Sequence, residues 1–323
     1  MIKEQPLWIL IPAIIGFLRL SNYILTFVIW VFITFIRKPK NLIKNYGSWA
    51  LVTGSTDGIG KSMAIQLAEQ GLNLVLVSRD LGKLKLVSEL ILGKYKNTQI
   101  RCVAVDLSGA GEGVIAAVEA AVMGIDLGVV VNNAGVTYEE ARYFDEVEER
   151  EWMNVVKVNL EGTTRVTKVV LKGMMERKRG AIVNVGSGAA IVVPSHPLFA
   201  VYAATKAYID KFSSSLHMEY KEFGIHVQCQ VPLYVSTKMA AKVAFLKGNP
   251  TMFVPSSDDY ARAAIRRIGY ESRCTPYWTH SFQWFLVSLL PEFVIDAWRL
   301  SIGIQRREKG RRHRSHNRLH STS

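Results

Sequence analysis

Hydrophobic side chains dominate residues 7–36 of the chain. Four residues interrupt the run: Pro12, Gly16, Arg19 and Asn22. The pattern predicts membrane attachment, either by one helix over Leu20–Ile36 or by a hairpin that pairs Leu7–Leu18 with Tyr23–Ile36. A cleaved signal peptide is the less favoured third interpretation, because the run is long and no small-residue cleavage site precedes the basic residues that follow it.

Positive charge follows this run directly, at Arg37, Lys38, Lys40 and Lys44. Basic residues beside a membrane span stay on the cytosolic side, so we expect the rest of the protein to face the cytosol. We assign residues 1–47 to a membrane anchor and its basic flank.

From Ser48 onward, short apolar runs alternate with helical patterns. Six of these runs predict buried strands: Trp49–Thr53, Leu72–Ser78, Ile100–Val105, Leu127–Asn132, Ala181–Val185 and His226–Val231. Helical stretches separate them, the first at Gly60–Gln70. Strands separated by helices predict an α/β fold with a doubly wound parallel sheet, and we place this domain at residues 48–275.

A second apolar and aromatic stretch lies at Trp278–Trp298. Pro291, Glu292 and Asp296 interrupt it, so an interfacial helix is favoured over a full membrane span. The alternative is a helix packed on the body of the protein. We predict a membrane-associated segment at residues 276–304 and a disordered, basic tail at residues 305–323.

The formal net charge of +13 raises the question of a nucleic-acid partner. The charge is concentrated at the ends, since residues 1–47 carry +5 and residues 305–323 carry +6. Basic ends fit an anionic lipid surface better than a nucleic-acid groove, and no zinc-finger or RNA-binding motif is present, so we expect no nucleic-acid partner. The three cysteines form no CxxC pair, which argues against a disulfide framework and favours a reducing compartment.

A glycine-rich turn joins the first predicted strand to the first helix with the spacing GxxxGxG. It consists of Gly54, Ser55, Thr56, Asp57, Gly58, Ile59 and Gly60. Glycine lets a backbone approach a pyrophosphate closely, and the following helix N-terminus offers free N–H groups to phosphates. Three glycines alone are a weak signal, but their place between a strand and a helix predicts a dinucleotide site.

Residues at the ends of the second and third strands are expected to complete this site. Arg79 follows the second strand, where its guanidinium can pair with a 2′-phosphate, so we predict NADPH as the cofactor. The alternative for Arg79 is a solvated strand end. Asp106 and Leu107 end the third strand, where a carboxylate can reach an adenine amino group, although Asp106 could equally cap a helix.

Small residues end the fourth strand, in the stretch Asn133, Ala134 and Gly135. Their size would let the strand end lie under the nucleotide, although much of this motif could be structural.

Tyr202 and Lys206 stand four residues apart in a helical stretch, so they share one face. The ordinary pKa of tyrosine is about 10, and a nearby ammonium is expected to stabilise the phenolate. Reduction of a carbonyl needs a hydride from a nicotinamide and a proton for the nascent alkoxide. Tyr202 would be the general acid, while Lys206 would tune it and hold the nicotinamide ribose. A surface helix pair is the alternative.

Ser187 follows the fifth strand and could donate a hydrogen bond to the substrate carbonyl. A serine-hydrolase interpretation is excluded, because Val185 occupies the first position of the GxSxG pattern. Asn159 lies in the helical stretch after the fourth strand and could support a water-linked proton path. Its alternative role is that of a buried amide bonded to the backbone.

These motifs, in this order, resemble the short-chain dehydrogenase/reductase family over roughly Ser48–Tyr270. The resemblance implies a Rossmann-type sheet and a catalytic tetrad of Asn159, Ser187, Tyr202 and Lys206. It also implies that Pro232 and Val235, after the sixth strand, contact the cofactor. Three further stretches, at residues 47–61, 227–239 and 274–278, resemble plant-like, membrane-bound very-long-chain 3-oxoacyl-CoA reductases, which are similar to hydroxysteroid dehydrogenases.

The resemblance implies NADPH-dependent reduction of 3-oxoacyl-CoA to 3-hydroxyacyl-CoA in fatty-acid elongation. It also implies the endoplasmic reticulum membrane, a long-chain acyl-CoA substrate and other elongase subunits as partners. A hydroxysteroid or retinoid oxidoreductase shares the same motifs, and a non-catalytic scaffold subunit is the alternative of another class. Several basic residues follow the sixth strand, and some could meet CoA phosphates: Lys238, Lys242, Lys247, Arg262, Arg266 and Arg267.

Overall fold

A computed structural model describes residues 7–109, 112–245 and 249–321, and the chain divides into two parts, Met1–Pro39 and Lys40–Ser323. The second part, called the body below, is built on one parallel sheet with the strand order β3-β2-β1-β4-β5-β6-β7. Its strands are β1 (Trp49–Thr53), β2 (Asn73–Ser78), β3 (Ile100–Ala104), β4 (Leu127–Asn132), β5 (Gly180–Val185), β6 (Ile225–Gln230) and β7 (Arg273–Cys274).

The predicted doubly wound parallel sheet is confirmed, and the first six strands lie within one residue of the predicted bounds. β1, β4 and β5 are buried along their whole length, as expected for central strands of a sheet covered on both faces. Strand β7 was not predicted. It has two residues, which is too short to show a periodic pattern.

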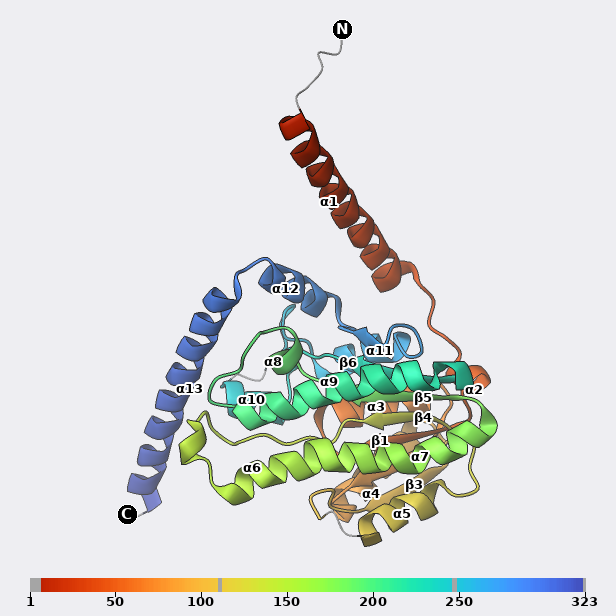
Figure 1. The fold of residues 1–323 in the computed structure, drawn as a ribbon. Coiled ribbons are helices and arrows are strands. Elements are labelled where there is room, and N and C mark those ends of the chain that lie inside the picture. The colour runs from red at the N-terminus through yellow and green to blue at the C-terminus, as the bar shows by residue number, and fades with distance from the viewer. Residues whose placement is uncertain (1–6, 110–111, 246–248, 322–323) are drawn as a thin grey trace. The chain divides into compact units, whose positions relative to one another are not determined.

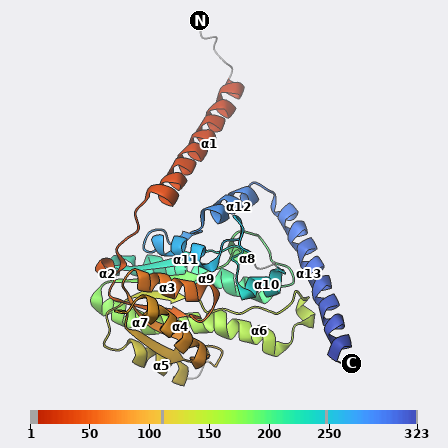
Figure 2. The same cartoon turned by 180° about the vertical axis from the view of Figure 1, so that it is seen from behind.

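Helices cover both faces of the sheet, and alternate residues of each strand point to opposite layers. Ala50 and Val52 of β1 pack with α3 (Gly58–Glu69), α4 (Leu81–Lys94) and α11 (Ser257–Arg266). Leu51 packs on the other face with α5 (Glu112–Val122), α7 (Thr163–Arg177) and α9 (Ala200–Tyr220). Figure 1 shows α7 and α9 in front of the sheet, and Figure 2 shows α3 and α4 on the opposite side.

The remaining elements of the body are short, except at the C-terminus. They are α2 (Leu42–Asn45), α6 (Glu149–Val156), α8 (Gly188–Ile191), α10 (Lys238–Ala244), α12 (Trp278–Ser288) and α13 (Glu292–Ser321), with the 3-10 helices η2 (Phe144–Glu146) and η4 (Lys221–Phe223) and the π-helix η3 (Lys157–Gly162). Helices α8, α10, α12 and α13 lie on the same side of the body, where the loops after β5 and β6 emerge (Figure 1).

The C-terminal region differs from the sequence-based prediction in two ways. The apolar stretch forms two helices, because α12 ends before Pro291, which cannot continue a helix, and α13 begins just after it. The tail over residues 305–323 was predicted to be disordered, and this is wrong as far as Ser321 because α13 continues through it. Tertiary contacts explain the difference, since Arg307 of α13 pairs with Glu146 and stacks on Tyr143. Residues 322 and 323 lie outside the described residues.

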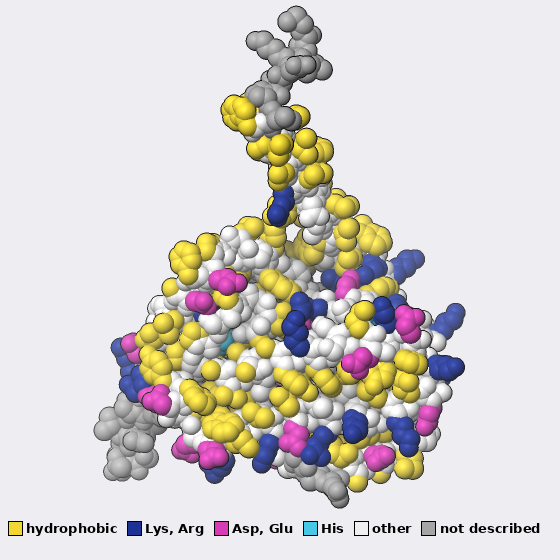
Figure 3. Space-filling model, in the orientation of Figure 1, with side chains coloured by type: hydrophobic (Ala, Val, Ile, Leu, Met, Phe, Trp, Pro, Cys, Tyr) yellow, Lys and Arg dark blue, Asp and Glu magenta, His cyan; other side chains and the backbone are white. Residues whose placement is uncertain are grey.

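Residues 7–36 of the N-terminal part form one continuous helix, made of α1 (Leu7–Val31) and the π-helix η1 (Phe32–Ile36). The hairpin alternative is therefore wrong, since Arg19 and Asn22 lie within the helix, and neither residue forces a turn. The 29 residues Trp8–Ile36 contain an 18-residue stretch with a mean hydropathy of 1.7, and the helix is long and apolar enough to cross a membrane. Figure 3 shows this helix covered with hydrophobic side chains.

Candidate active site

A cavity of about 630 Å³ lies at the carboxyl ends of the strands. Its wall is formed by the turn between β1 and α3, the end of β4, the loop between β5 and α9, the segment after β6, and helices α12 and α13. Ligand sites of open parallel sheets lie at this edge, so the cavity is the candidate active site.

The glycine-rich turn begins the cavity wall and starts helix α3. Gly54 and Gly58 have φ values of 63° and 51°, which favour glycine, and Asp57 caps the helix by accepting a 2.8 Å hydrogen bond from the Gly58 N–H. Gly60 packs so closely that a Cβ there would lie 2.3 Å from both the Gly54 carbonyl oxygen and Asn133 Nδ2. The turn therefore holds the α3 N-terminus directly at the cavity.

Not every residue of the turn faces the cavity. Four of them line it: Gly54, Asp57, Gly58 and Ile59. Ser55 is buried and bonds the carbonyl of Val77, while Thr56 bonds Ser78 at 3.1 Å. Ser55 and Thr56 therefore tie the turn to strand β2, and Gly60 permits close packing.

The end of β4 forms the floor beside this turn, where Asn133, Ala134 and Gly135 all line the cavity. Asn133 Nδ2 donates to the carbonyl oxygens of Thr53 at 3.0 Å and Gly54 at 3.2 Å, so its amide fixes the turn rather than facing a ligand. A Cβ on Gly135 would lie 3.4 Å from Lys206 Nζ, so the missing side chain leaves room for the lysine.

Arg79, Asp106 and Leu107 lie outside the cavity lining, at the carboxyl ends of β2 and β3. Arg79 is exposed, and its charge helps to lower the pKa of Asp106, although the hydrogen bond from the Ser108 N–H is the main cause of that shift. Asp106 thus closes a local turn at Ser108, while Leu107 is buried in the core. An exposed guanidinium at this strand end remains available to a phosphate.

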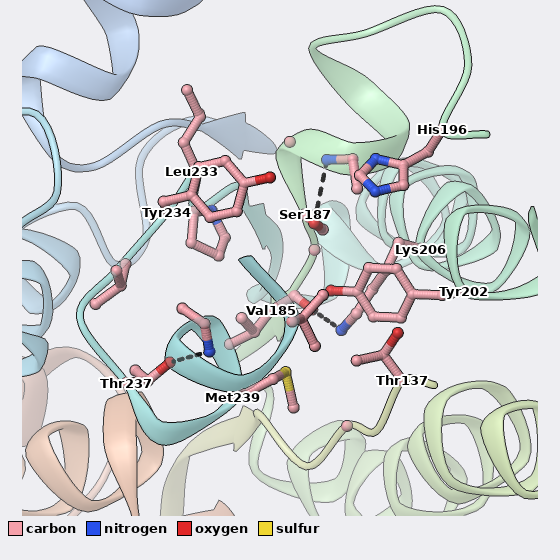
Figure 4. A pocket seen from close by; sticks show the side chains of 18 of the residues that line it. Thr137, Val185, Ser187, His196, Tyr202, Lys206, Leu233, Tyr234, Thr237 and Met239 are labelled. Atoms are coloured by element: carbon pink, nitrogen blue, oxygen red, sulfur yellow. Dashed lines mark hydrogen bonds between the residues drawn. The ribbon is translucent and has the colours of Figure 1, made fainter. Parts of the chain in front are cut away.

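Tyr202 and Lys206 lie one turn apart on α9 and both line the cavity (Figure 4). Lys206 is buried, and its Nζ donates a 2.8 Å hydrogen bond to the carbonyl oxygen of Val185. Burial lowers the pKa of Lys206 to about 8. The amine therefore titrates close to neutral pH.

Ser187 connects the tyrosine to the end of β5. Its Oγ accepts a 3.1 Å hydrogen bond from the Ala189 N–H as the N-cap of α8, and its hydroxyl bonds the phenol of Tyr202. Burial raises the pKa of Tyr202, and the bond from Ser187 only partly opposes this. The sequence-based expectation that Lys206 would lower this pKa is wrong for the free protein, because burial dominates the shift and the charge of Lys206 is not among its causes.

Asn159 lies in the π-helix η3 and does not line the cavity. Its Oδ1 accepts from the Val136 N–H at 2.7 Å, and its Nδ2 donates to the Val136 carbonyl at 2.9 Å and to Thr205 Oγ1 at 3.1 Å. The side chain therefore links the segment after β4 to α9, as in the alternative of a backbone-bonded amide. π-helical segments often mark functional sites.

Pro232 and Val235 line the cavity from the segment after β6, and the Pro232 carbonyl accepts a 2.9 Å hydrogen bond from the Gly188 N–H. The polar lining residues that the sequence analysis missed include His196, Tyr234, Arg299 and Arg306. Figure 4 shows the hydroxyls of Tyr202 and Tyr234 pointing into the cavity from opposite sides. The seven-residue spacing of Arg299 and Arg306 indicates that they share one face of a helix. Nothing in the sequence shows that this helix lies beside the segment after β6.

These residues fit a nicotinamide dinucleotide. The α3 N-terminus and the open backbone at Gly54 and Gly58 suit a pyrophosphate, and the cavity continues from them to Tyr202 and Lys206. Residues 48–245 match the family described as short chain dehydrogenase. The chain belongs to this family.

Three relatives give the family assignment more detail. The chain is 50% identical over 306 residues to a very-long-chain 3-oxoacyl-CoA reductase-like protein of Arabidopsis thaliana, covering 94% of this chain and 97% of the relative. It is 39% identical over 252 residues to the Homo sapiens very-long-chain 3-oxoacyl-CoA reductase, covering 77% of each. It is also 39% identical over 263 residues to inactive hydroxysteroid dehydrogenase-like protein 1 of Homo sapiens, covering 81% of this chain and 78% of that one.

Two solved structures show the same fold, one of them with bound NADPH. A short-chain dehydrogenase from Sphingobium yanoikuyae in complex with NADPH is 27% identical with a TM-score of 0.61, covering 68% of this chain and 83% of that one. A 3-oxoacyl-[acyl-carrier protein] reductase from Brucella melitensis is 26% identical with a TM-score of 0.61, covering 74% and 90%. As a short-chain dehydrogenase, the chain is an oxidoreductase that uses a nicotinamide cofactor.

Proposed function

We propose that this short-chain dehydrogenase uses NADPH to reduce a very-long-chain 3-oxoacyl-CoA to the 3-hydroxyacyl-CoA, as a step of fatty-acid elongation. The observation that carries the proposal is the convergence of Tyr202, Ser187 and Lys206 on one cavity. The reductases named among its relatives supply the substrate class.

The reaction adds a hydride and a proton across one C=O bond. A reduced nicotinamide, when bound, supplies the hydride. Tyr202 donates the proton to the carbonyl oxygen, and its raised pKa keeps the phenol protonated at neutral pH. Ser187 is oriented by the Ala189 N–H, which leaves its own hydroxyl proton free for the substrate oxygen or the phenol. Lys206 stabilises the phenolate that remains after transfer.

Asn159 serves this mechanism as a positioning residue. Its amide bonds hold Thr205, which lies between the two catalytic positions on α9, and the Val136 backbone after β4. Loss of the amide would leave buried partners without hydrogen bonds and would loosen α9 against the cofactor side of the cavity.

NADPH rather than NADH is proposed because of Arg79. The exposed guanidinium stands at the end of β2, the strand that follows the glycine-rich turn and its helix. An adenosine 2′-phosphate carries the charge that a guanidinium recognises, whereas a free 2′-hydroxyl is better bound by a carboxylate.

We further propose that the protein resides in the endoplasmic reticulum membrane with its body in the cytosol, beside other elongase subunits. The long apolar helix and the basic residues after it support the membrane and the orientation. Exposed hydrophobic side chains on α12, on α13 and in the short link between them support a contact with the membrane interface. They are Phe285, Leu289, Leu290, Phe293 and Trp298. A substrate with a soluble CoA head and a lipid tail suits such a location.

The test is NADPH oxidation by full-length, detergent-solubilised protein across a panel of 3-oxoacyl-CoA chain lengths, with a 17-ketosteroid as the competing substrate. Tyr202→Phe is expected to lower kcat by roughly 100-fold or more, because general acid catalysis contributes about that much. Tyr208→Phe is the matched control, since Tyr208 lies on the same helix but bonds Thr164 instead of facing the cavity.

Faster turnover of the ketosteroid would favour a hydroxysteroid oxidoreductase. If Tyr202→Phe still complemented a reductase-deficient cell, a non-catalytic scaffold would be favoured. One relative is named as inactive, which is why this alternative is kept.

A further inference from the structure

Helix α13 brings two arginines, Arg299 and Arg306, to the wall of the cavity. Gly303 packs against the loop before α9, where a Cβ would lie 3.0 Å from Leu198 Cδ1 and 3.4 Å from the Pro197 carbonyl oxygen. Arg299 and Arg306 stand four residues before and three residues after this glycine, so they share its helical face. The close approach at Gly303 explains how both side chains reach the cavity.

Both guanidiniums contact neutral groups rather than carboxylates. Arg299 is buried, with 8% of its surface exposed, and its Nη2 lies 2.7 Å from Nδ1 of His196. Arg306 Nη2 donates to the hydroxyl of Tyr234 at 2.8 Å, and its guanidinium lies over the Tyr234 ring. His196 is neutral at physiological pH, because burial and the two arginine charges lower its pKa to about 3.

The charges of these two arginines are not balanced by a carboxylate in the described part of the chain. Within residues 7–109, 112–245 and 249–321, neither Arg299 nor Arg306 forms an ion pair, and Arg299 Nε is buried without a hydrogen-bond partner. A buried guanidinium, that of Arg299, and a half-buried one, that of Arg306, on the same cavity wall are unfavourable unless an opposite charge joins them.

Three of the basic residues that the sequence analysis considered for CoA phosphates already pair with carboxylates. Lys238 pairs with Asp57 at 2.7 Å, and Lys242 pairs with Glu139. Arg262 pairs with Asp259 at 3.4 Å, and Lys247 lies outside the described residues.

We propose that Arg299 and Arg306 form an oxyanion site that binds phosphate oxygens of the CoA carrier. This inference rests on the proposed function and adds the orientation of the substrate. The polar head runs toward α13, and the acyl tail runs along the apolar part of the wall, formed by Val192, Val193, Leu286 and Val287. Planar guanidiniums match phosphate oxygens through paired N–H donors.

The test compares two substrates that differ in phosphate content, a 3-oxoacyl-CoA and the N-acetylcysteamine thioester of the same 3-oxo acid. Arg306→Leu should raise the ratio of their KM values, CoA thioester over N-acetylcysteamine thioester, by roughly 10- to 100-fold, the loss expected for a charge-assisted contact. Arg307→Leu is the matched control on the next residue of α13, because Arg307 pairs with Glu146 and does not line the cavity. An unchanged ratio in Arg306→Leu would overturn the proposal, since a purely structural arginine would affect both substrates alike.

Binding of CoA without turnover gives an independent measurement. Calorimetric titration of the full-length protein should show weaker CoA affinity in Arg306→Leu and unchanged affinity in Arg307→Leu. Dephospho-CoA and 4′-phosphopantetheine, titrated in parallel, identify which phosphate the site takes. Equal CoA affinity in both variants refutes the oxyanion site, whereas absence of 3-oxoacyl reduction with intact CoA binding refutes only the proposed function.

Discussion

Tyr202 and Lys206 illustrate how burial changes the chemistry of a residue pair. The spacing predicted an ammonium that would make the phenol more acidic, but the cavity shifts the pKa of Tyr202 upward and that of Lys206 downward. Both shifts have the same cause, because desolvation disfavours the charged form of each group. A phenol that stays protonated is suited to proton donation, which is the direction that carbonyl reduction needs.

The pKa of Lys206 predicts the pH dependence of reduction. Its ammonium is present below about pH 8 and is lost as the pH rises through that value. If the charge stabilises the phenolate, kcat/KM should be level below pH 8 and fall above it, because this ratio reports the free enzyme. Steady-state rates from pH 6 to pH 10, with circular dichroism to monitor folding, test this. A level profile to pH 10 would show that the lysine charge is not required.

Arg79 gives a second prediction about a single residue, which concerns the preference for NADPH over NADH. Arg79→Asp should weaken NADPH binding by roughly 10- to 100-fold and leave NADH binding nearly unchanged or improved, because only NADPH carries the 2′-phosphate. Fluorescence titration of both cofactors measures this. Lys96→Asp is the charge-matched control, since Lys96 is an exposed residue of the loop after α4. Equal losses for both cofactors would contradict the assignment.

Elements that are defined by local pattern could be predicted from the sequence, and those defined by tertiary contact could not. Strand β1, its glycine-rich turn and α3 follow one another in the chain, so their spacing alone located them. The part of helix α13 from Gln305 onward looked like a disordered tail because it is basic and polar, and only the contacts of α13 with Glu146 and Leu198 show why it is ordered. The same reasoning explains why Arg299 and Arg306 were missed, while Tyr202 and Lys206 were found.

The junction of β1 and α3 gives a prediction about an element. Gly60→Ala should lower the free energy of unfolding by about 1–3 kcal/mol and weaken cofactor binding, because the new Cβ would collide with the Gly54 carbonyl oxygen and displace the helix N-terminus. Gly93→Ala in α4 is the control. A Cβ there meets nothing within 4 Å, so this change should stabilise the helix slightly. Thermal or urea unfolding distinguishes the two, and equal effects would argue against the tight junction.

At the scale of the whole molecule, one cavity brings together segments that are separated by most of the chain. The glycine-rich turn lies near residue 54, the proposed catalytic residues near 187–206, and the arginines of α13 near 299–306. The two parts of the chain differ in character. The N-terminal helix is apolar enough to cross a membrane, and all residues that line the cavity belong to the body. In the two proposals above, helix α13 selects the substrate and Tyr202, Ser187 and Lys206 carry out the reduction.

The most direct measurement of this account follows a single deuterium atom. Full-length protein is incubated with a 3-oxoacyl-CoA and NADPH that carries deuterium on the transferred position, and the product is analysed by mass spectrometry. We expect 3-hydroxyacyl-CoA with deuterium on C3 for the wild-type protein and for Tyr208→Phe, and roughly 100-fold less of it for Tyr202→Phe. Absence of labelled product from the wild-type protein, or equal label from Tyr202→Phe, would contradict it.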